Sequence, residues 1–258
     1  MLKKIFQIIG RLCFMVTIPL ASTIHIFILN KYRPGTRQYK IFIDDWIPFV
    51  KYFAIPYQFM VIFITIVLVY FAIVDYRYYF KLLATVLIAT GICYIIFCFF
   101  PSTVNRPTDS NGNLIKVGGD FFLDMVQNIR DNDKPYDCFP SIHVISCYLP
   151  MLFVLKHNKS MLMNIFAFIS GVSITLSTMF LKQHYFLDAF VSIIIGTILF
   201  LVFTNNLLWN MIPFKSKMSH LVPPILRDWK QKLWDKYICK HRLHLMRRHF
   251  ALKLINWH

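Results

Sequence analysis

The chain has 258 residues, of which 57% are hydrophobic, and it carries a formal net charge of +16. Ordinary soluble domains contain about 45–50% apolar residues, counting glycine, so this composition excludes a typical soluble fold and favours a membrane protein. A basic chain can bind nucleic acid, but no DNA- or RNA-binding motif is present, and we expect the charge to act in membrane orientation and at lipid headgroups.

Six stretches of the chain lack Lys, Arg, Asp and Glu over a length that crosses, or nearly crosses, a bilayer. A spanning helix needs roughly 20 apolar residues. In chain order, the expected spans are Leu12–Asn30, Tyr52–Val74, Leu82–Asn105, Cys138–Leu155, Ser160–Leu181 and Ala189–Phe214. The fourth is short, and we expect it to begin in the membrane interface. The sequence therefore predicts an all-α bundle of six transmembrane helices within residues 1–214.

A basic tail, residues 215–258, follows the last expected span. After Pro223 and Pro224, it interleaves lysine and arginine with apolar residues such as Trp229 and Leu233. This spacing is typical of a basic amphipathic helix that lies on an anionic cytosolic leaflet. A partner-binding helix and a disordered tail are the alternatives.

Six crossings put both termini on one side of the membrane and the two long polar loops, Lys31–Lys51 and Pro101–Asp137, on the other. We expect the termini to be cytosolic and the membrane to be the plasma membrane. The tail carries most of the positive charge on the cytosolic side, so the positive-inside rule alone decides little. In this orientation, the end of the third span and the starts of the fourth and sixth spans emerge together at the outer face.

A histidine and an aspartate lie four residues apart where the sixth span begins. His184 and Asp188 therefore share one helical face. A carboxylate in this position can accept a hydrogen bond from one ring nitrogen, which leaves the other nitrogen available as a nucleophile or a base. A structural pair at the membrane interface is an equally good interpretation of these two residues alone.

Other polar residues flank two further spans at the same face. Pro140 and Ser141 precede His143, and free backbone N–H groups at such a helix start favour an anion. Arg106 follows the third span, where it could contact phosphate through two parallel hydrogen bonds. Asp137 is close enough in sequence to His143 to tune it. Each has an ordinary structural explanation, but two histidines, a carboxylate and an arginine on one face together predict a phosphoryl-transfer site.

The order and spacing of these residues resemble the type 2 phosphatidic acid phosphatase (PAP2) superfamily, whose pattern has three blocks. The first block, Lys-x6-Arg-Pro, is matched only by Arg106-Pro107. The second block, Pro-Ser-Gly-His, appears as Pro140-Ser141-Ile142-His143. The third block, Ser-Arg-x5-His-x3-Asp, keeps every spacing, as Ser177-Thr178, His184 and Asp188. The resemblance extends roughly from Leu12 to Leu208 and implies a six-helix fold.

The resemblance also implies a role for each matched residue. His184 would be the nucleophile that forms a phosphohistidine, Asp188 its orienting partner, and His143 the general acid for the leaving group. The residues that would hold the phosphate are Arg106, Ser141 and Ser177. No metal ion or other cofactor is implied.

Three positions depart from the family's pattern. Phe99 stands in place of the lysine, Thr178 in place of the third-block arginine, and Ile142 in place of the glycine. Two of the three expected phosphate-binding cations are therefore missing, and Lys182, two residues before His184, could supply one charge. The Phe-Pro-Ser-x-His and His-Tyr-x-x-Asp forms are more similar to the inositol-phosphorylceramide-synthase branch, whose members move a phospho-headgroup between lipids.

These observations predict a membrane-embedded, metal-independent phosphatase that acts on a lipid phosphate. Transfer of a headgroup to a lipid alcohol is the first alternative. A non-catalytic protein that binds or transports a lipid phosphate on the same bundle is the second alternative. The identity of the lipid and the oligomeric state stay open.

Overall fold

All regular elements in the described part of the chain are helices. The computed structural model describes Gly10 and residues 37–106, 119–157 and 160–205. In chain order, the elements are α3 (Ile43–Trp46), the 3₁₀ turn η2 (Lys51–Phe53), α4 (Ala54–Val74), α5 (Tyr76–Phe99), α6 (Phe121–Asn132), α7 (Ile142–His157), α8 (Met161–Phe180) and α9 (Phe186–Thr204). The expected first span and the basic tail lie outside the described residues.

Four of these helices are long and apolar enough to cross a membrane: α4 together with η2, α5, α8 and α9. Large apolar side chains cover their outer surfaces, and examples that are more than half exposed are Ile62, Ile73, Ile95, Ile169 and Ile198. Lipid explains this surface, because acyl chains solvate apolar side chains while the helices satisfy their own backbone groups. The predicted count of six spans is not confirmed, since four helices of the described residues meet these criteria.

The expected fourth span is present as the shorter helix α7. It begins at Ile142 and has 16 residues. The preceding residues do not continue the helix, because Ser102 Oγ accepts hydrogen bonds from the backbone N–H groups of Cys138 and Phe139 and holds them in a turn.

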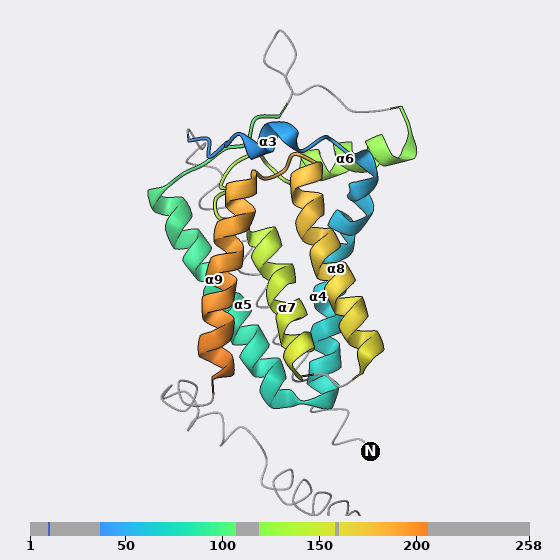
Figure 1. The fold of residues 1–258 in the computed structure, drawn as a ribbon, viewed down its shortest axis with the longest axis vertical. Coiled ribbons are helices and arrows are strands. Elements are labelled where there is room, and N and C mark those ends of the chain that lie inside the picture. The colour runs from blue at the N-terminus through green and yellow to red at the C-terminus, as the bar shows by residue number, and fades with distance from the viewer. Residues whose placement is uncertain (1–9, 11–36, 107–118, 158–159, 206–258) are drawn as a thin grey trace, which may run out of the picture. The chain divides into compact units, whose positions relative to one another are not determined.

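The helix α7 occupies the centre of the described bundle. It packs against α4, α5, α8 and α9, and side chains such as Cys147 and Phe153 are fully buried. In Figure 1, its first turn lies lower than the neighbouring ends of α8 and α9. Two residues of this first turn, Ile142 and His143, line a cavity at that end of the bundle.

The boundaries of α5 differ from the expected span. The helix begins at Tyr76 because Asp75 caps it, with Asp75 Oδ1 accepting a hydrogen bond from the N–H of Arg77. Its first turns therefore include charged residues that the uncharged stretch left out. It ends at Phe99, shortly before Pro101, as expected for a residue that disfavours helix before it.

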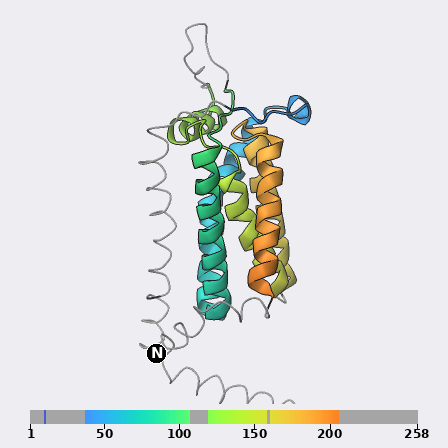
Figure 2. The same ribbon diagram turned by 90° about the vertical axis from the view of Figure 1, so that its left-hand side faces the viewer.

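The long polar loop predicted at Pro101–Asp137 contains an amphipathic helix, α6. Asp120 caps its start by accepting a hydrogen bond from the N–H of Leu123, and Lys51 pairs with the same carboxylate. The buried residues Val126 and Ile129 face α4 and η2. Figures 1 and 2 show α6 and α3 lying across the same end of the bundle, above the start of α7.

The helices α7 and α8 approach closely at Gly171. A Cβ atom on Gly171 would lie 2.7 Å from Sδ and 2.9 Å from Cβ of Met151. Small residues permit such approaches between membrane helices. The position of α7 in the bundle therefore depends on the missing side chain of Gly171.

We predict that Gly171→Ala lowers the free energy of unfolding by about 1–3 kcal/mol, because Met151 must move. Thermal unfolding of the protein in detergent measures the change. The matched control is Gly91→Ala in α5, where an added Cβ meets nothing within 4 Å and alanine is the better helix former by about 1 kcal/mol. An equal loss of stability in both variants would contradict the packing explanation.

Candidate active site

Four segments of the chain meet around a cavity at the end of the bundle that carries α6. Tyr57 comes from the first turns of α4, Asp133 follows α6, His143 lies in the first turn of α7, and Gln183 and His184 precede α9. These five residues line a cavity of about 470 Å³. In the described part of the chain, no group of three or more His, Cys, Asp or Glu side chains is placed to hold a metal ion. Metal independence stays a prediction.

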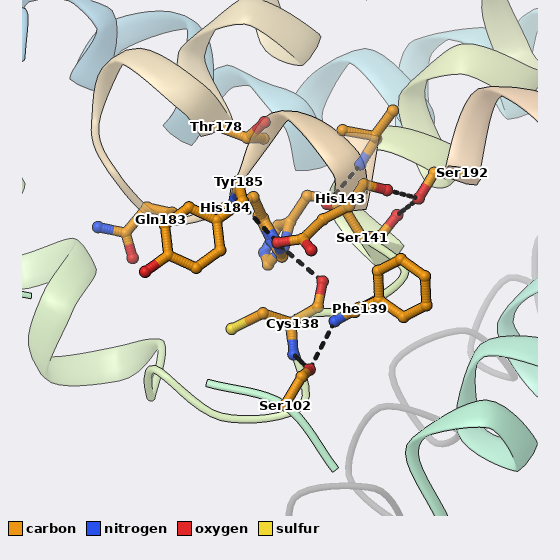
Figure 3. A network of polar contacts seen from close by, with 12 residues as sticks. Ser102, Cys138, Phe139, Ser141, His143, Thr178, Gln183, His184, Tyr185 and Ser192 are labelled. Carbon is orange, nitrogen blue, oxygen red and sulfur yellow. Dashed lines mark hydrogen bonds and ion pairs between the residues drawn. The ribbon is translucent and has the colours of Figure 1, made fainter. Parts of the chain in front are cut away.

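The two histidines singled out in the sequence contact each other. Nδ1 of His143 lies 3.1 Å from Nε2 of His184, and the ring centroids are 5.3 Å apart. Figure 3 shows both rings at the centre of a network of polar side chains. A single hydrogen atom links the two rings, so their protonation states depend on what each ring contacts on its other side.

The second ring nitrogen of His184 faces two oxygen atoms. Nδ1 lies 3.0 Å from the backbone carbonyl oxygen of Cys138 and 3.5 Å from Oδ2 of Asp188. A carbonyl oxygen only accepts, so Nδ1 carries the hydrogen and Nε2 offers its lone pair to His143. Asp188 is thus the more distant partner. The same Asp188 oxygen accepts a hydrogen bond from the N–H of Tyr185 at 2.8 Å and caps α9.

Ser102 positions the carbonyl group that His184 contacts. Its buried Oγ accepts hydrogen bonds from the N–H groups of Cys138, at 2.9 Å, and Phe139, at 2.8 Å. The carbonyl oxygen of Ser102 accepts a further bond from the N–H of Asp137 at 2.8 Å. The turn that precedes α7 is therefore bound to the segment that follows α5, as Figure 3 shows for the Oγ contacts.

The second ring nitrogen of His143 faces a tyrosine and a carboxylate. The hydroxyl oxygen of Tyr57 lies 2.5 Å from Oδ2 of Asp133 and 3.1 Å from Nε2 of His143, and Nε2 lies 3.8 Å from the same Asp133 oxygen. Burial acts to raise the pKa of Asp133. The charge of a protonated His143 and the hydrogen bond from Tyr57 outweigh burial and hold this pKa below its usual value. Asp133 is therefore ionised at neutral pH.

The proton positions follow from the ionised carboxylate. Two oxygen atoms 2.5 Å apart need a hydrogen between them, so Tyr57 donates its only hydrogen to Asp133. The Tyr57 oxygen then accepts a hydrogen from Nε2 of His143, while Nδ1 of His143 donates to His184. Burial acts against the resulting charge on His143, and the neighbouring Asp133 carboxylate acts in its favour. This arrangement places a hydrogen on Nδ1 of His143 opposite the lone pair on Nε2 of His184.

Arg106 lies beside His184 through an intervening glutamine. Its Nη2 donates to Oε1 of Gln183, and its Nη1 donates to the backbone oxygen of Arg130 at 3.1 Å. Burial lowers the pKa of Arg106 and the ionised Asp133 acts against this shift, but a guanidinium stays charged in either case. The arginine predicted from the first block therefore bonds to the residue before His184, but it is not among the residues that line the cavity.

The two predicted serines lie outside the cavity lining. Ser141 is buried, and its Oγ accepts a hydrogen bond from the N–H of Val144 at 3.3 Å, in the first turn of α7. Ser177 Oγ donates to the carbonyl oxygen of Ile174 at 2.6 Å, within α8. Both hydroxyl groups bond to their own helix, so their contacts in this structure are structural.

Lys182 contacts a different part of the chain. Its Nζ donates to the backbone carbonyl oxygens of Asp44, at 2.9 Å, and of Ile47, and its φ of 56° lies in the left-handed region. Asp44 Oδ1 in turn accepts a hydrogen bond from the N–H of Phe186 at 2.7 Å, where α9 begins. The helix α3 therefore holds the turn that carries His184, and Lys182 is not among the residues that line the cavity.

Sequence reasoning missed several groups in the cavity. Tyr57 lies in a uniformly apolar span, and Asp133 is one of several acids in a polar loop, so neither has a local motif. Asp137 was the acid expected to tune His143. It lines the cavity, but the carboxylate that faces the ring is Asp133. A tyrosine in the first turns of an otherwise apolar span is the one signal that could have pointed to Tyr57.

Comparison with protein families agrees with the motifs. Residues 38–202 match the family model of the PAP2 superfamily, which is more than half of the chain. The chain therefore belongs to the PAP2 superfamily. Membership and the apolar helices together indicate an integral membrane protein that transfers phosphoryl groups on lipid phosphates. Comparisons with curated proteins and with solved structures found no match.

Proposed function

We propose that this protein transfers the phosphoryl group of a lipid phosphate to water through a phosphohistidine on His184. The observation that carries this proposal is the 3.1 Å approach of His143 Nδ1 to His184 Nε2 at the edge of the cavity. Because Cys138 engages Nδ1 of His184, Nε2 is the atom left with a lone pair. Membership of the PAP2 superfamily supports the same chemistry.

In the first step, Nε2 of His184 attacks phosphorus, and the bond between phosphorus and the lipid oxygen breaks. The hydrogen on Nδ1 of His143 passes to that oxygen, so the lipid leaves as a neutral alcohol. The two rings touch in the free protein, so the phosphoryl group must enter between them. His143 then donates to the leaving oxygen instead of to His184. Arg106 offsets the developing negative charge.

In the second step, a water molecule gives a hydrogen to Nδ1 of His143 while its oxygen attacks phosphorus. The bond between phosphorus and Nε2 of His184 breaks, and orthophosphate is released. Tyr57 and Asp133 act on the opposite nitrogen of His143, so they are positioning residues. They stabilise the imidazolium before the first step and again after the second.

Two alternatives use the same residues. A lipid hydroxyl in place of water would make the protein a headgroup phosphotransferase, and the motif forms around His143 and His184 favour this outcome because they are similar to the inositol-phosphorylceramide-synthase branch. A protein that binds or transports a lipid phosphate without turnover is the alternative of another class. The replaced motif cations, at Phe99 and Thr178, are the observation that supports it.

We expect His184→Ala to abolish turnover, lowering it by on the order of 10³-fold or more. The assay uses purified protein, vesicles containing phosphatidic acid labelled in its phosphate, and ceramide as an optional acceptor whose phosphorylated product differs from the substrate. Labelled orthophosphate indicates hydrolysis, and labelled lipid product indicates transfer. Quenching in SDS at alkaline pH, followed by alkaline gel analysis, should detect an acid-labile, base-stable phosphoprotein in the parent chain only.

The matched control is His157→Ala. His157 also pairs with a carboxylate, since its Nε2 lies 3.2 Å from Oδ2 of Asp75, but it lies at the opposite end of α7. This variant should keep the turnover of the parent protein. Full turnover in His184→Ala would overturn the assignment of the nucleophile, and tight binding of labelled lipid without any turnover would favour the non-catalytic alternative.

We predict that Asp133→Asn shifts the alkaline limb of the kcat/KM profile to lower pH by about one unit or more. The pKa of Asp133 is held below its usual value, so the carboxylate is ionised throughout the assay range and stabilises the acid form of His143. Without that charge, the general acid loses its hydrogen at lower pH. Asp131→Asn, an exposed position on α6, is the control. An unmoved alkaline limb in Asp133→Asn would contradict the role assigned to this carboxylate.

We propose that the cavity faces the outer side of the plasma membrane and that both termini are cytosolic, with the tail, residues 215–258, on the anionic leaflet. An amine-reactive reagent that cannot cross membranes should then label the exposed Lys134, near the cavity, in intact cells. It should label the exposed Lys156, at the other end of α7, only after the cells are opened. Mass spectrometry of the labelled protein measures both sites, and the reverse pattern would invert the orientation.

A further inference from the structure

Two neighbouring arginines carry buried nitrogen atoms without partners. Nε of Arg106 and both Nε and Nη1 of Arg130 are buried and have no hydrogen-bond acceptor, and the two residues are 6% and 4% exposed. Among the residues that the structure describes, no carboxylate forms an ion pair with either guanidinium. Buried charged donors are costly unless they are bonded, so this arrangement lacks an acceptor.

The two charges are also close to each other. Nη1 of Arg106 donates to the backbone oxygen of Arg130 at 3.1 Å. Burial lowers the pKa of both guanidinium groups, and the positive charge of Arg106 lowers that of Arg130 further. Both groups nevertheless stay protonated. Two adjacent buried cations repel each other, and an anion bound to both offsets that repulsion.

Neither arginine of the pair lines the cavity of the histidine pair, but each is connected to residues that do. Arg106 bonds to Gln183, which precedes His184 in the chain. Arg130 lies on α6 between Ile129 and Asn132, and both of these neighbours line the cavity, as does Gln183.

The ring of Phe49 does not supply the acceptor that Nε and Nη1 of Arg130 lack. Its Cζ lies 5.8 Å from the ring centroid of Phe49, which covers one face of the guanidinium. A ring below the face does not accept hydrogen bonds in the guanidinium plane. The in-plane N–H groups are those that two oxygen atoms of a phosphate can bind side by side.

We propose that Arg106 and Arg130 together bind the phosphate group of the substrate, with Arg130 supplying a cation that the family's motifs no longer provide. This inference rests on the proposed function. The motif positions themselves offer no substitute, because Phe99 is 71% exposed and Thr178 Oγ1 donates to Thr175 within α8. Two guanidinium groups match the two charges of a phosphomonoester, so the pair favours a lipid with a terminal phosphate over a phosphodiester.

The test measures orthophosphate binding by its effect on thermal unfolding of the full chain in detergent, at constant chloride concentration. A ligand that binds the folded state raises the unfolding temperature with its concentration. Arg130→Met should raise the dissociation constant for orthophosphate by about tenfold or more. In the absence of phosphate, the Arg130→Met variant should unfold at the same temperature as the parent or higher, because the substitution removes a buried unpaired charge. Arg130→Lys, which keeps the charge without the fork, should bind with intermediate affinity.

The matched control is Arg77→Met, which removes an exposed arginine from the start of α5, at the other end of the bundle, and should bind orthophosphate as the parent does. Three results would overturn the inference: no stabilisation of the parent by orthophosphate, an unchanged dissociation constant in Arg130→Met, or a lower unfolding temperature with unchanged binding. The last two would mean that water or packing alone satisfies the guanidinium.

Turnover separates this inference from the proposed function. If the parent protein hydrolyses phosphatidic acid and Arg130→Met does so with unchanged kcat/KM, the arginine pair is not the phosphate site and the function stands. If the parent binds orthophosphate through Arg130 but turns over no lipid phosphate, the anion site stands and the catalytic proposal fails. For Arg130→Met, kcat/KM should fall by about tenfold or more for phosphatidic acid, and by less for a phosphodiester lipid.

Discussion

The contact between His143 and His184 requires two separate turns of the chain to meet at one depth in the bundle. Both turns are bound to other segments. Ser102 holds the turn before α7, so that the Cys138 carbonyl faces one ring, and Asp44 holds the turn before α9. The hydrogen bonds that Ser102 and Asp44 accept act on the backbone of the two turns and not on the imidazole rings. The geometry of the histidine pair is therefore a property of the loops at this end of the bundle.

The sequence predicted the parts of the fold that depend on long-range composition and on short motifs. Long uncharged stretches located α4, α5, α8 and α9, because membrane helices must be apolar over their whole length. The motif spacings located His143, His184 and Arg106, which the structure brings together. Helix ends were less predictable, since a cap such as Asp75 can place charged residues inside a helix that an uncharged stretch excludes.

The remaining features depend on tertiary contacts that leave little trace in the local sequence. The helix α6 is short and amphipathic, and the polar composition of its segment predicted a loop. Because α6 was not foreseen, neither were the positions of Asp133 beside His143 and of Arg130 beside Arg106. Lys182 shows the converse case: its closeness to His184 in the chain suggested a role, but a residue in the left-handed conformation directs its side chain to another segment.

The length of α7 has a consequence for how a lipid would meet the site. Its 16 residues rise about 24 Å, which is less than the roughly 30 Å of a hydrocarbon core. A helix of this length does not cross a full hydrocarbon core, and its first turn, with His143, lies lower than the neighbouring ends of α8 and α9. A lipid phosphate that reached His143 would therefore have to enter between the ends of those two helices.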